Sequence, residues 1–155
     1  MRLTTKHLLA LVFTGFIASA AVAQSAETTP EEPLFRVGDM EDLSEFRWKK
    51  RPVVVFADSA DDPAFIEQLE LLEAREDELR ERDVVVLTDT DPAARSALRL
   101  KMRPRGFMLV IVGKDGGIKL RKPFPWDVRE ISRSIDKMPM RQREIREAKE
   151  AADGG

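Results

Sequence analysis

The chain of 155 residues contains no cysteine and no tyrosine, and its single histidine is His7. Thiol–disulfide exchange, peroxidase chemistry through a thiolate and Cys–His catalysis are therefore excluded. His7 lies in a stretch that we predict is removed, so Ser–His–Asp catalysis and imidazole-based zinc or copper sites are excluded from the mature protein as well. Carboxylates, lysine, arginine and hydroxyl groups remain as its reactive side chains.

The first 23 residues have the pattern of a secretory signal peptide. Arg2 and Lys6 supply positive charge, an apolar core spans 8–18, and Ala21-Val22-Ala23 fits a small-x-small cleavage site. We expect cleavage after Ala23 and a periplasmic or secreted location. The alternative is an uncleaved membrane anchor, but the apolar run is shorter than the roughly 20 residues that a spanning helix needs. The sequence thus predicts no stable membrane anchor after cleavage.

Charge and length restrict the class of protein further. Removal of Arg2 and Lys6 would take the net charge from −2 to about −4. Nucleic-acid binders usually have a basic balance or face, so we expect no nucleic-acid partner. A chain of this length buries enough surface to fold as one domain without disulfides.

The chain divides into four segments. Residues 1–23 are the predicted signal peptide, and 24–38, which are rich in Glu, Thr and Pro, are predicted to form a flexible linker. Residues 39–138 form the predicted domain, and 139–155 are expected to be a charged tail, helical or disordered.

The strongest structural pattern lies between Phe107 and Arg121. An unbroken apolar run, 107–112, leads into Gly113-Lys114-Asp115-Gly116-Gly117, and then apolar and basic residues alternate over 118–121. Asp-Gly between two such runs is a strong hairpin signal, because glycine adopts positive φ freely. The hairpin therefore predicts a buried strand followed by a half-buried edge strand.

Two further apolar strands precede the hairpin, at 53–57 and 84–87. Helices are predicted at 63–82 and, more briefly, from Ala94 to Met102, and a third at 126–137 follows the hairpin. Two buried strands joined by a long helix should pair in parallel. The order predicts an α/β, thioredoxin-like fold: a four-stranded mixed sheet with helices on both faces.

Several stretches also resemble one family. They are Arg51 to Ala57, Asp61-Asp62-Pro63, Gly106 to Arg121 and Met138-Pro139-Met140-Arg141. They are similar to small exported bacterial proteins catalogued only as a domain of unknown function with a thioredoxin-like fold. The resemblance implies that fold and export, and it implies no activity.

Thioredoxins themselves carry Cys-x-x-Cys after the first buried strand, and a cis-proline before the hairpin strand. In this chain, the place of Cys-x-x-Cys is taken by Ala60-Asp61-Asp62-Pro63. The place of the cis-proline loop is taken by Arg105-Gly106-Phe107-Met108, and Pro104 lies near the cis-proline position without coinciding with it. Redox activity is therefore not carried over.

Polar residues gather where ligand sites usually lie in open α/β sheets, beyond the carboxyl ends of parallel strands. The candidates for a ligand or partner rim are Asp58, Asp61, Asp62, Asp89, Arg103 and Arg105, with Asp91 beside them. The carboxylates suit a hard cation, Ca²⁺ or Mg²⁺, although Asp62 and Asp91 also precede prolines as helix caps do. The two arginines either pair with Asp58 or Asp61 or recognise a peptide or anion.

The sequence therefore favours a non-enzymatic, exported thioredoxin-like module without a cofactor, which binds a protein or peptide. Two alternatives remain open. One is a hydrolase that uses carboxylates and a hard metal, and the other is a periplasmic peptide holdase that uses an exposed sheet edge.

Overall fold

The computed structural model describes residues 32–37 and 42–155. The predicted signal peptide and most of the predicted linker lie outside the described residues.

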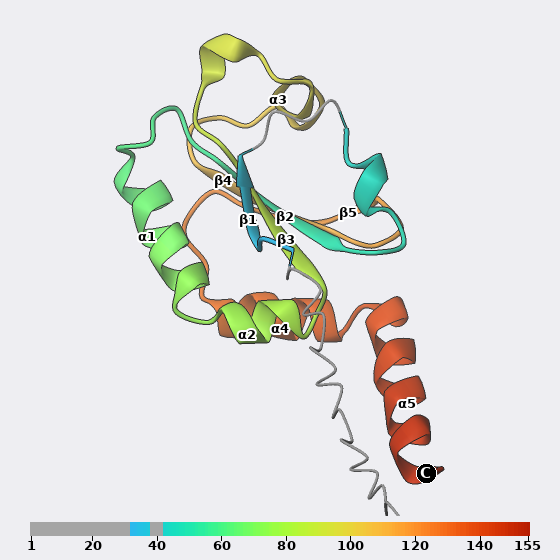
Figure 1. Ribbon diagram of the computed structural model, residues 1–155. Coiled ribbons are helices and arrows are strands. Elements are labelled where there is room, and N and C mark those ends of the chain that lie inside the picture. The colour runs from blue at the N-terminus through green and yellow to red at the C-terminus, as the bar shows by residue number, and fades with distance from the viewer. Residues whose placement is uncertain (1–31, 38–41) are drawn as a thin grey trace, which may run out of the picture. The chain divides into compact units, whose positions relative to one another are not determined.

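A five-stranded mixed sheet forms the centre of the domain (Figure 1). Its strands are β1 (Phe35–Val37), β2 (Arg51–Phe56), β3 (Val84–Asp89), β4 (Met108–Val112) and β5 (Ile118–Lys122), in the spatial order β1-β3-β2-β4-β5. β2 and β3 pair in parallel, and β4 and β5 are antiparallel. Every residue of β2 is buried, as expected for a central strand.

The sheet has one strand more than the four predicted. The additional strand, β1, pairs in parallel with β3 and lies within the segment predicted as a flexible linker. Leu34 precedes it, is 3% exposed, and accepts a hydrogen bond from the Val86 amide at 2.7 Å. A three-residue strand is too short to show a period in the sequence, so the polar composition around it dominated the prediction.

Helices cover both faces of the sheet, as predicted. Five α-helices and two 3₁₀ turns are present in the described ranges: η1 (Ser44–Phe46), α1 (Pro63–Glu73), α2 (Glu76–Arg80), η2 (Pro92–Ala94), α3 (Ala97–Met102), α4 (Val128–Asp136) and α5 (Pro139–Asp153). One core cluster joins the sheet to α1, α2 and α4, and a second joins the other face to η1 and α3. No helix of the described segments is both long and apolar enough to cross a membrane.

The predicted helix 63–82 is divided into α1 and α2. Arg75 leaves the helical conformation, with φ −142° and ψ 43°, and α2 then runs beside α4. The side chain of Arg82, just after α2, binds Asp136 at the end of α4 with two hydrogen bonds, of 3.0 and 2.9 Å. This contact between distant segments favours the bend, which the helical period of the sequence does not show.

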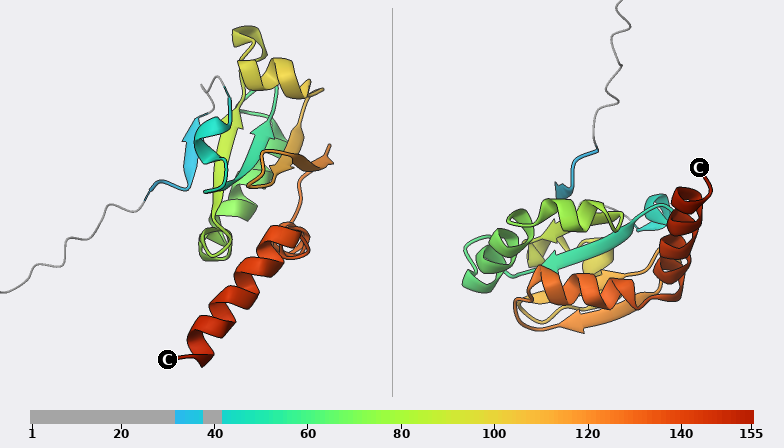
Figure 2. Two further views of the ribbon diagram at one scale, coloured as in Figure 1. Left: turned by 90° about the vertical axis from the view of Figure 1, so that its right-hand side faces the viewer. Right: turned by 90° about the horizontal axis from the view of Figure 1, so that it is seen from below.

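Helix α5 extends from the domain in the two views of Figure 2. None of its residues is buried. It follows α4 directly, with Pro139 at its first turn, where proline is well tolerated. The predicted charged tail is thus a helix whose attachment depends on polar contacts rather than on a buried apolar face.

Trp48 lies largely outside the core. Its side chain is 60% exposed, whereas the nearby Phe46 is 3% exposed. Trp48 has φ +67°, and its amide donates to the Lys114 carbonyl at 2.7 Å. The sequence could not show this left-handed turn, which fixes the backbone of Trp48 against the β4–β5 turn.

Gln68 links α1 to the start of α4. It is fully buried, its Nε2 donates to the Trp126 carbonyl at 3.0 Å, and its Oε1 accepts from the Trp126 amide at 2.7 Å. We predict that Gln68→Met lowers the free energy of unfolding by about 2 kcal/mol, because both polar groups of Trp126 lose their partner. Urea unfolding measures this, with Glu67→Met at the exposed neighbouring position as the control. A loss no larger than that of the control would contradict the prediction.

Candidate functional site

The predicted aspartates lie at or just beyond the carboxyl ends of β2 and β3, and two of them cap helical turns. Asp62 accepts from the Ala64 amide at 2.8 Å at the start of α1. Asp91 accepts from the Ala93 and Ala94 amides at 2.9 and 3.2 Å at the start of η2. Side-chain caps of this kind contribute about 1 kcal/mol each.

Asp89 is held by a residue that sequence reasoning missed, Arg99 of α3. The two side chains are joined by hydrogen bonds from Arg99 Nε and Nη2 to Asp89 Oδ1, of 3.1 and 2.8 Å. Arg99 Nη2 also donates to the carbonyls of Ala57 and Asp89, at 2.7 and 3.0 Å. One guanidinium therefore ties the ends of β2 and β3 together, and we call this contact the Arg99 clasp.

The clasp keeps Asp89 ionised. Burial alone would raise the pKa of this carboxyl, but hydrogen bonds from Arg99 and from the Ser96 hydroxyl hold the pKa below its usual value. Asp89 therefore acts as a structural anion rather than as a proton donor.

Asp58 and Asp61 remain at the surface of this rim, and the predicted partners of Asp58 are not the observed one. Arg99 Nη1, rather than Arg103 or Arg105, lies 3.5 Å from Asp58 Oδ1. Arg103 and Arg105 are exposed and form no ion pair with any described residue. The loop itself does pass the rim, because a Cβ on Gly106 would lie 4.0 Å from Asp58 Oδ2. Of the two alternatives for Arg103 and Arg105, the structure does not show pairing with Asp58 or Asp61, and recognition of a peptide or anion stays a prediction.

The rim brings together Asp58, Asp89 and Arg99, and it places Asp61 at the surface, where its amide binds the Ser59 hydroxyl at 3.1 Å. Among residues 32–37 and 42–155, no three acidic side chains are placed to hold one metal ion. Of the carboxylates that suggested Ca²⁺ or Mg²⁺, those of Asp62 and Asp91 cap helical turns, and that of Asp89 is bound in the Arg99 clasp.

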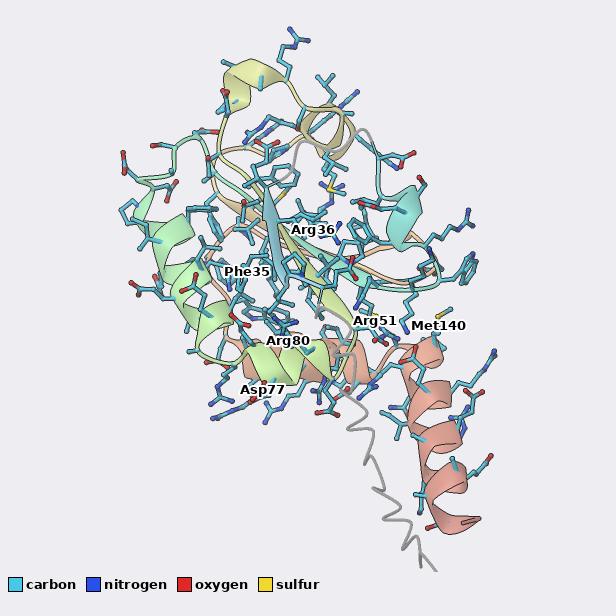
Figure 3. The ribbon with its side chains drawn as sticks, in the orientation of Figure 1. Phe35, Arg36, Arg51, Asp77, Arg80 and Met140 are labelled. Atoms are coloured by element: carbon cyan, nitrogen blue, oxygen red, sulfur yellow. The ribbon has the colours of Figure 1, made fainter. Side chains whose placement is uncertain are left out.

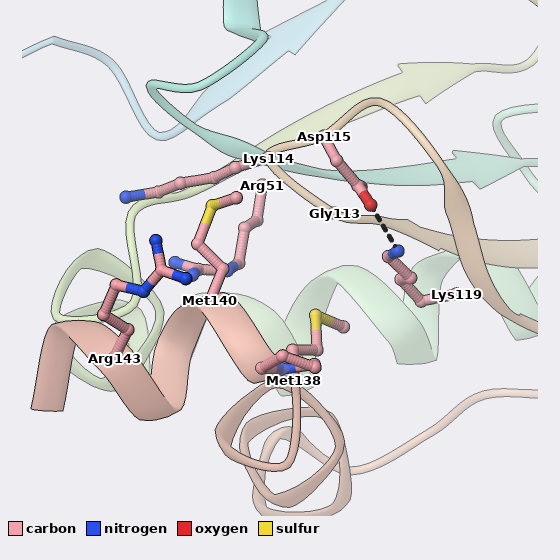
Figure 4. Close-up of a pocket in the computed structure, with 9 residues that line it drawn as sticks. Arg51, Gly113, Lys114, Asp115, Lys119, Met138, Met140 and Arg143 are labelled. Atoms are coloured by element: carbon pink, nitrogen blue, oxygen red, sulfur yellow. Dashed lines mark hydrogen bonds and ion pairs between the residues drawn. The ribbon is translucent and has the colours of Figure 1, made fainter.

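A cavity of about 230 Å³ lies at the opposite end of β2, between the β4–β5 turn and the beginning of α5 (Figure 4). Its lining residues are Arg51, Gly113, Lys114, Asp115, Lys119, Met138, Pro139, Met140 and Arg143. All of them except Arg143 come from segments that carry the family resemblance, namely the start of β2, the hairpin and Met138-Pro139-Met140-Arg141. We call this cavity the α5 pocket.

Arg51 forms the inner wall of the α5 pocket and is 1% exposed. Figure 3 shows its side chain between the sheet and the start of α5, near Met140. Its Nη1 donates to the Arg82 carbonyl at 2.9 Å, and its Nη2 donates to Glu144 Oε1 of α5 at 2.9 Å. A buried guanidinium needs such partners, because unpaired charge is costly to bury.

Glu144 also binds Lys114, whose ammonium lies 2.8 Å from Glu144 Oε1 and 2.7 Å from Asp83 Oδ2. Burial raises the pKa of Glu144, but hydrogen bonds from Arg51 and Lys114 outweigh it and leave the pKa below its usual value. A second contact, from Arg141 Nη2 to Glu81 at 3.0 Å, also ties α5 to the domain.

The lining of the α5 pocket is more basic than acidic. Lys119 is paired with Asp115 at 2.6 Å (Figure 4), and this contact lowers the pKa of Asp115. Arg51 and Lys114 are balanced by Glu144 and Asp83. Arg143 is exposed and forms no ion pair with any described residue, so one positive charge is left over. The arrangement suits the binding of a negatively charged group, and its carboxylates are held ionised rather than poised to exchange protons.

Comparison with known proteins agrees with this architecture. The model of a family described as "Domain of unknown function (DUF4174)" matches residues 42–144. Among solved structures, the reduced 2-Cys peroxiredoxin of Plasmodium vivax is similar with a TM-score of 0.52 and 16% identity, over 65% of this chain and 84% of that chain. Prx1a of Plasmodium yoelii is similar with a TM-score of 0.50 and 16% identity, over 64% and 79%. These likenesses show the thioredoxin-like fold.

The Arg99 clasp leads to a stability prediction. We expect Arg99→Met to lower the free energy of unfolding by about 3 kcal/mol, because Asp89 would remain buried without its counter-charge. The double variant Asp89→Asn/Arg99→Met should lose less than Arg99→Met alone, since no uncompensated charge remains. Urea unfolding at pH 7 tests both, with the exposed Lys101→Met on the same helix as the control. Equal losses for Arg99→Met and Lys101→Met would show that the clasp contributes nothing.

Glu144 leads to a pH prediction. The pKa of Glu144 is lowered in the folded chain. The stability that its ion pairs give to the attachment of α5 is therefore complete above the ordinary glutamate pKa of about 4.3, and it is lost as the pH falls below that value. Amides of α5 should be about fivefold better protected from hydrogen exchange than in Glu144→Gln at pH 6–7, and this difference should shrink as the pH falls below about 4.3. Glu147→Gln is the matched control, at an exposed position of α5. A difference as large at pH 3 as at pH 6–7 would contradict this assignment.

Proposed function

Since this chain belongs to the family described as Domain of unknown function (DUF4174), whose name assigns no activity, we propose its function from the site itself: a binding module without catalytic activity that holds a small anion with an apolar part in the α5 pocket. The observation that supports this proposal most directly is the surplus cation Arg143 at the mouth of a cavity whose other charges are balanced.

The charges of the α5 pocket suit a ligand with one negative group. A carboxylate at the mouth would meet the exposed guanidinium of Arg143, which offers paired donors to a planar anion. A dianion would have to compete with Glu144 for Arg51 and Lys114, and these contacts are already short, at 2.9 and 2.8 Å. The site is therefore expected to prefer monoanions.

The apolar part of the ligand would lie against Met138, Pro139 and Met140. Methionine adapts to irregular shapes because its side chain is unbranched and polarizable. A cavity of about 230 Å³ lies below the usual range of pockets for drug-sized molecules. The proposed ligand is consequently of the size of one amino-acid residue, either free or at the carboxyl terminus of a peptide.

The binding role also follows from the side chains that the protein contains. There is no cysteine, and the only histidine is His7 within the predicted signal peptide. The carboxyls of Asp115, which lines the α5 pocket, and of Glu144, which binds its lining residues Arg51 and Lys114, have lowered pKa values, which makes them poor proton donors at neutral pH. We extend the proposal to a periplasmic or secreted setting on the basis of that signal sequence.

A screen of small carboxylates by thermal shift and calorimetry tests this function. We expect an acylated apolar amino acid such as N-acetyl-methionine to bind, and its amide, which lacks the charge, to bind at least tenfold more weakly. Arg143→Gln should weaken binding of the carboxylate about tenfold, because one charge-assisted hydrogen-bonding partner is lost. Arg146→Gln, an exposed arginine one turn along α5, should leave affinity unchanged.

Two results would contradict the proposal. One is equal binding of the carboxylate and the amide, and the other is equal loss of affinity in the Arg143→Gln and Arg146→Gln variants. Turnover of a substrate by the purified chain, abolished by Asp61→Asn, would replace the binding role with a catalytic one.

A further inference from the structure

Charge is strongly segregated along this chain. Residues 58–91 contain thirteen Asp and Glu residues and three arginines, whereas residues 92–126 contain nine Lys and Arg residues and a single acid, Asp115. The whole chain has a net charge of only −2, because the excess of acids in 58–91 and the excess of bases in 92–126 largely cancel. A basic segment of this kind can attract an acidic partner to whatever surface it forms.

Three of these nine cations, Lys119, Arg121 and Lys122, lie on β5, at one margin of the sheet. β5 is the last strand in the order β1-β3-β2-β4-β5, and among the described residues it pairs only with β4. In Figure 2 this strand lies along the outer margin of the sheet, uncovered by a helix. An edge strand offers unpaired amide and carbonyl groups to an additional strand.

The cations of this edge point to both faces of the sheet, because successive residues of a strand alternate. Arg121 Nη1 donates to the Met102 carbonyl at 2.6 Å, which holds Arg121 against the end of α3. Lys122 lies on the other face, with its ammonium 4.6 Å from the centre of the Trp126 ring. Both cations are thus oriented by neutral partners rather than by acids.

No acidic side chain neutralises these two residues. Among the described residues Arg121 and Lys122 form no ion pair, and neither do Lys101 and Arg103 at the adjacent end of α3. Within the strand, Ile118 is 41% exposed and supplies an apolar contact. The edge therefore combines free backbone groups, unpaired positive charge and one apolar side chain.

We propose that the β5 edge binds an extended acidic segment of a partner protein, which adds to the sheet as a sixth strand. The backbone of the segment pairs with the open side of β5. Its carboxylates, on alternate faces of the added strand, meet Arg121 on one face and Lys122 on the other. Arg121 and Lys122 do not line the α5 pocket, to which β5 contributes Lys119, and different variants test the two proposals.

Positive charge on an edge strand also has a simpler consequence, which is that it prevents two copies from pairing edge to edge. The same repulsion makes the proposed interaction selective. A second copy of β5 would bring cations against cations, whereas an acidic strand would replace that repulsion with attraction. Discrimination against the chain's own edge is therefore part of the recognition that we infer.

The test uses the full mature chain and a fluorescein-labelled decapeptide that repeats Glu-Glu-Val-Thr, because paired Glu residues place carboxylates on both faces of an added strand. We expect saturable binding by fluorescence anisotropy at 50 mM salt, weakened by 300 mM salt. A peptide of equal charge in which proline replaces Val and Thr should bind at least tenfold more weakly, because proline cannot supply the ladder hydrogen bonds. Amides on the outer side of β5 should exchange more slowly in the complex.

Variants then locate the site. Arg121→Glu and Lys122→Glu should each weaken peptide binding at least tenfold, and Arg121→Gln should weaken it less than Arg121→Glu. Arg146→Glu on α5 makes the same change of charge at an exposed position and should have little effect. Circular dichroism and thermal unfolding show whether each variant is folded. If Arg121→Glu does not fold, the Arg121→Gln variant still tests the site.

Three outcomes would overturn the proposal. The first is equal affinity for the proline-containing and the strand-forming peptide, which would show attraction by charge alone. The second is equal loss in Arg146→Glu and Arg121→Glu. The third is binding to vesicles with 30% anionic phospholipid, sensitive to Arg121→Glu, without binding of the peptide, which would make the surface a membrane contact.

Discussion

The buried guanidinium of Arg51 is the constraint on which the candidate site depends. It begins the fully buried central strand β2, so it cannot turn toward water, and it must find acceptors inside the protein. One acceptor is the carbonyl of Arg82, and the other is the carboxylate of Glu144 on α5. Helix α5 buries none of its own residues, so this requirement does more than apolar packing to hold it beside the sheet. The α5 pocket exists because α5 is held there.

A second guanidinium, that of Arg99, has the corresponding role at the other end of the same strands. It binds the carbonyls of Ala57 and Asp89 and the Asp89 carboxylate, and so it closes the edge at which thioredoxin-like folds often place their chemistry. Each end of the central parallel pair is thus stabilised by one buried arginine. The two differ in what they bind: Arg99 bridges neighbouring strands, whereas Arg51 recruits a separate helix and leaves a cavity beside it.

The sequence was a good guide wherever the determining forces were local. The Asp-Gly turn predicted the β4–β5 hairpin, and prolines after Asp62 and Asp91 predicted two caps that the structure contains. It was a poor guide to β1, to the bend at Arg75 and to the partners of the rim aspartates, because contacts between distant segments decide these. Arg51 and Arg99 look like ordinary surface arginines in a chain with 35% charged residues. Their burial depends on which carboxylate the fold brings to each.

The same reasoning explains why the proposed binding surface at β5 lies where it does. The acids of residues 58–91 and the bases of 92–126 meet mainly through Arg99 and Lys114, which pair with Asp89 and Asp83 across the sheet. Cations that these few contacts do not reach remain unpaired, and the topology places them at the open edge of β5 and along α3. Neither β5 nor α3 contains an acid that could pair with them within the same element. The unpaired charge on this margin therefore follows from how the strands are ordered, and it is the feature that the proposed acidic partner would recognise.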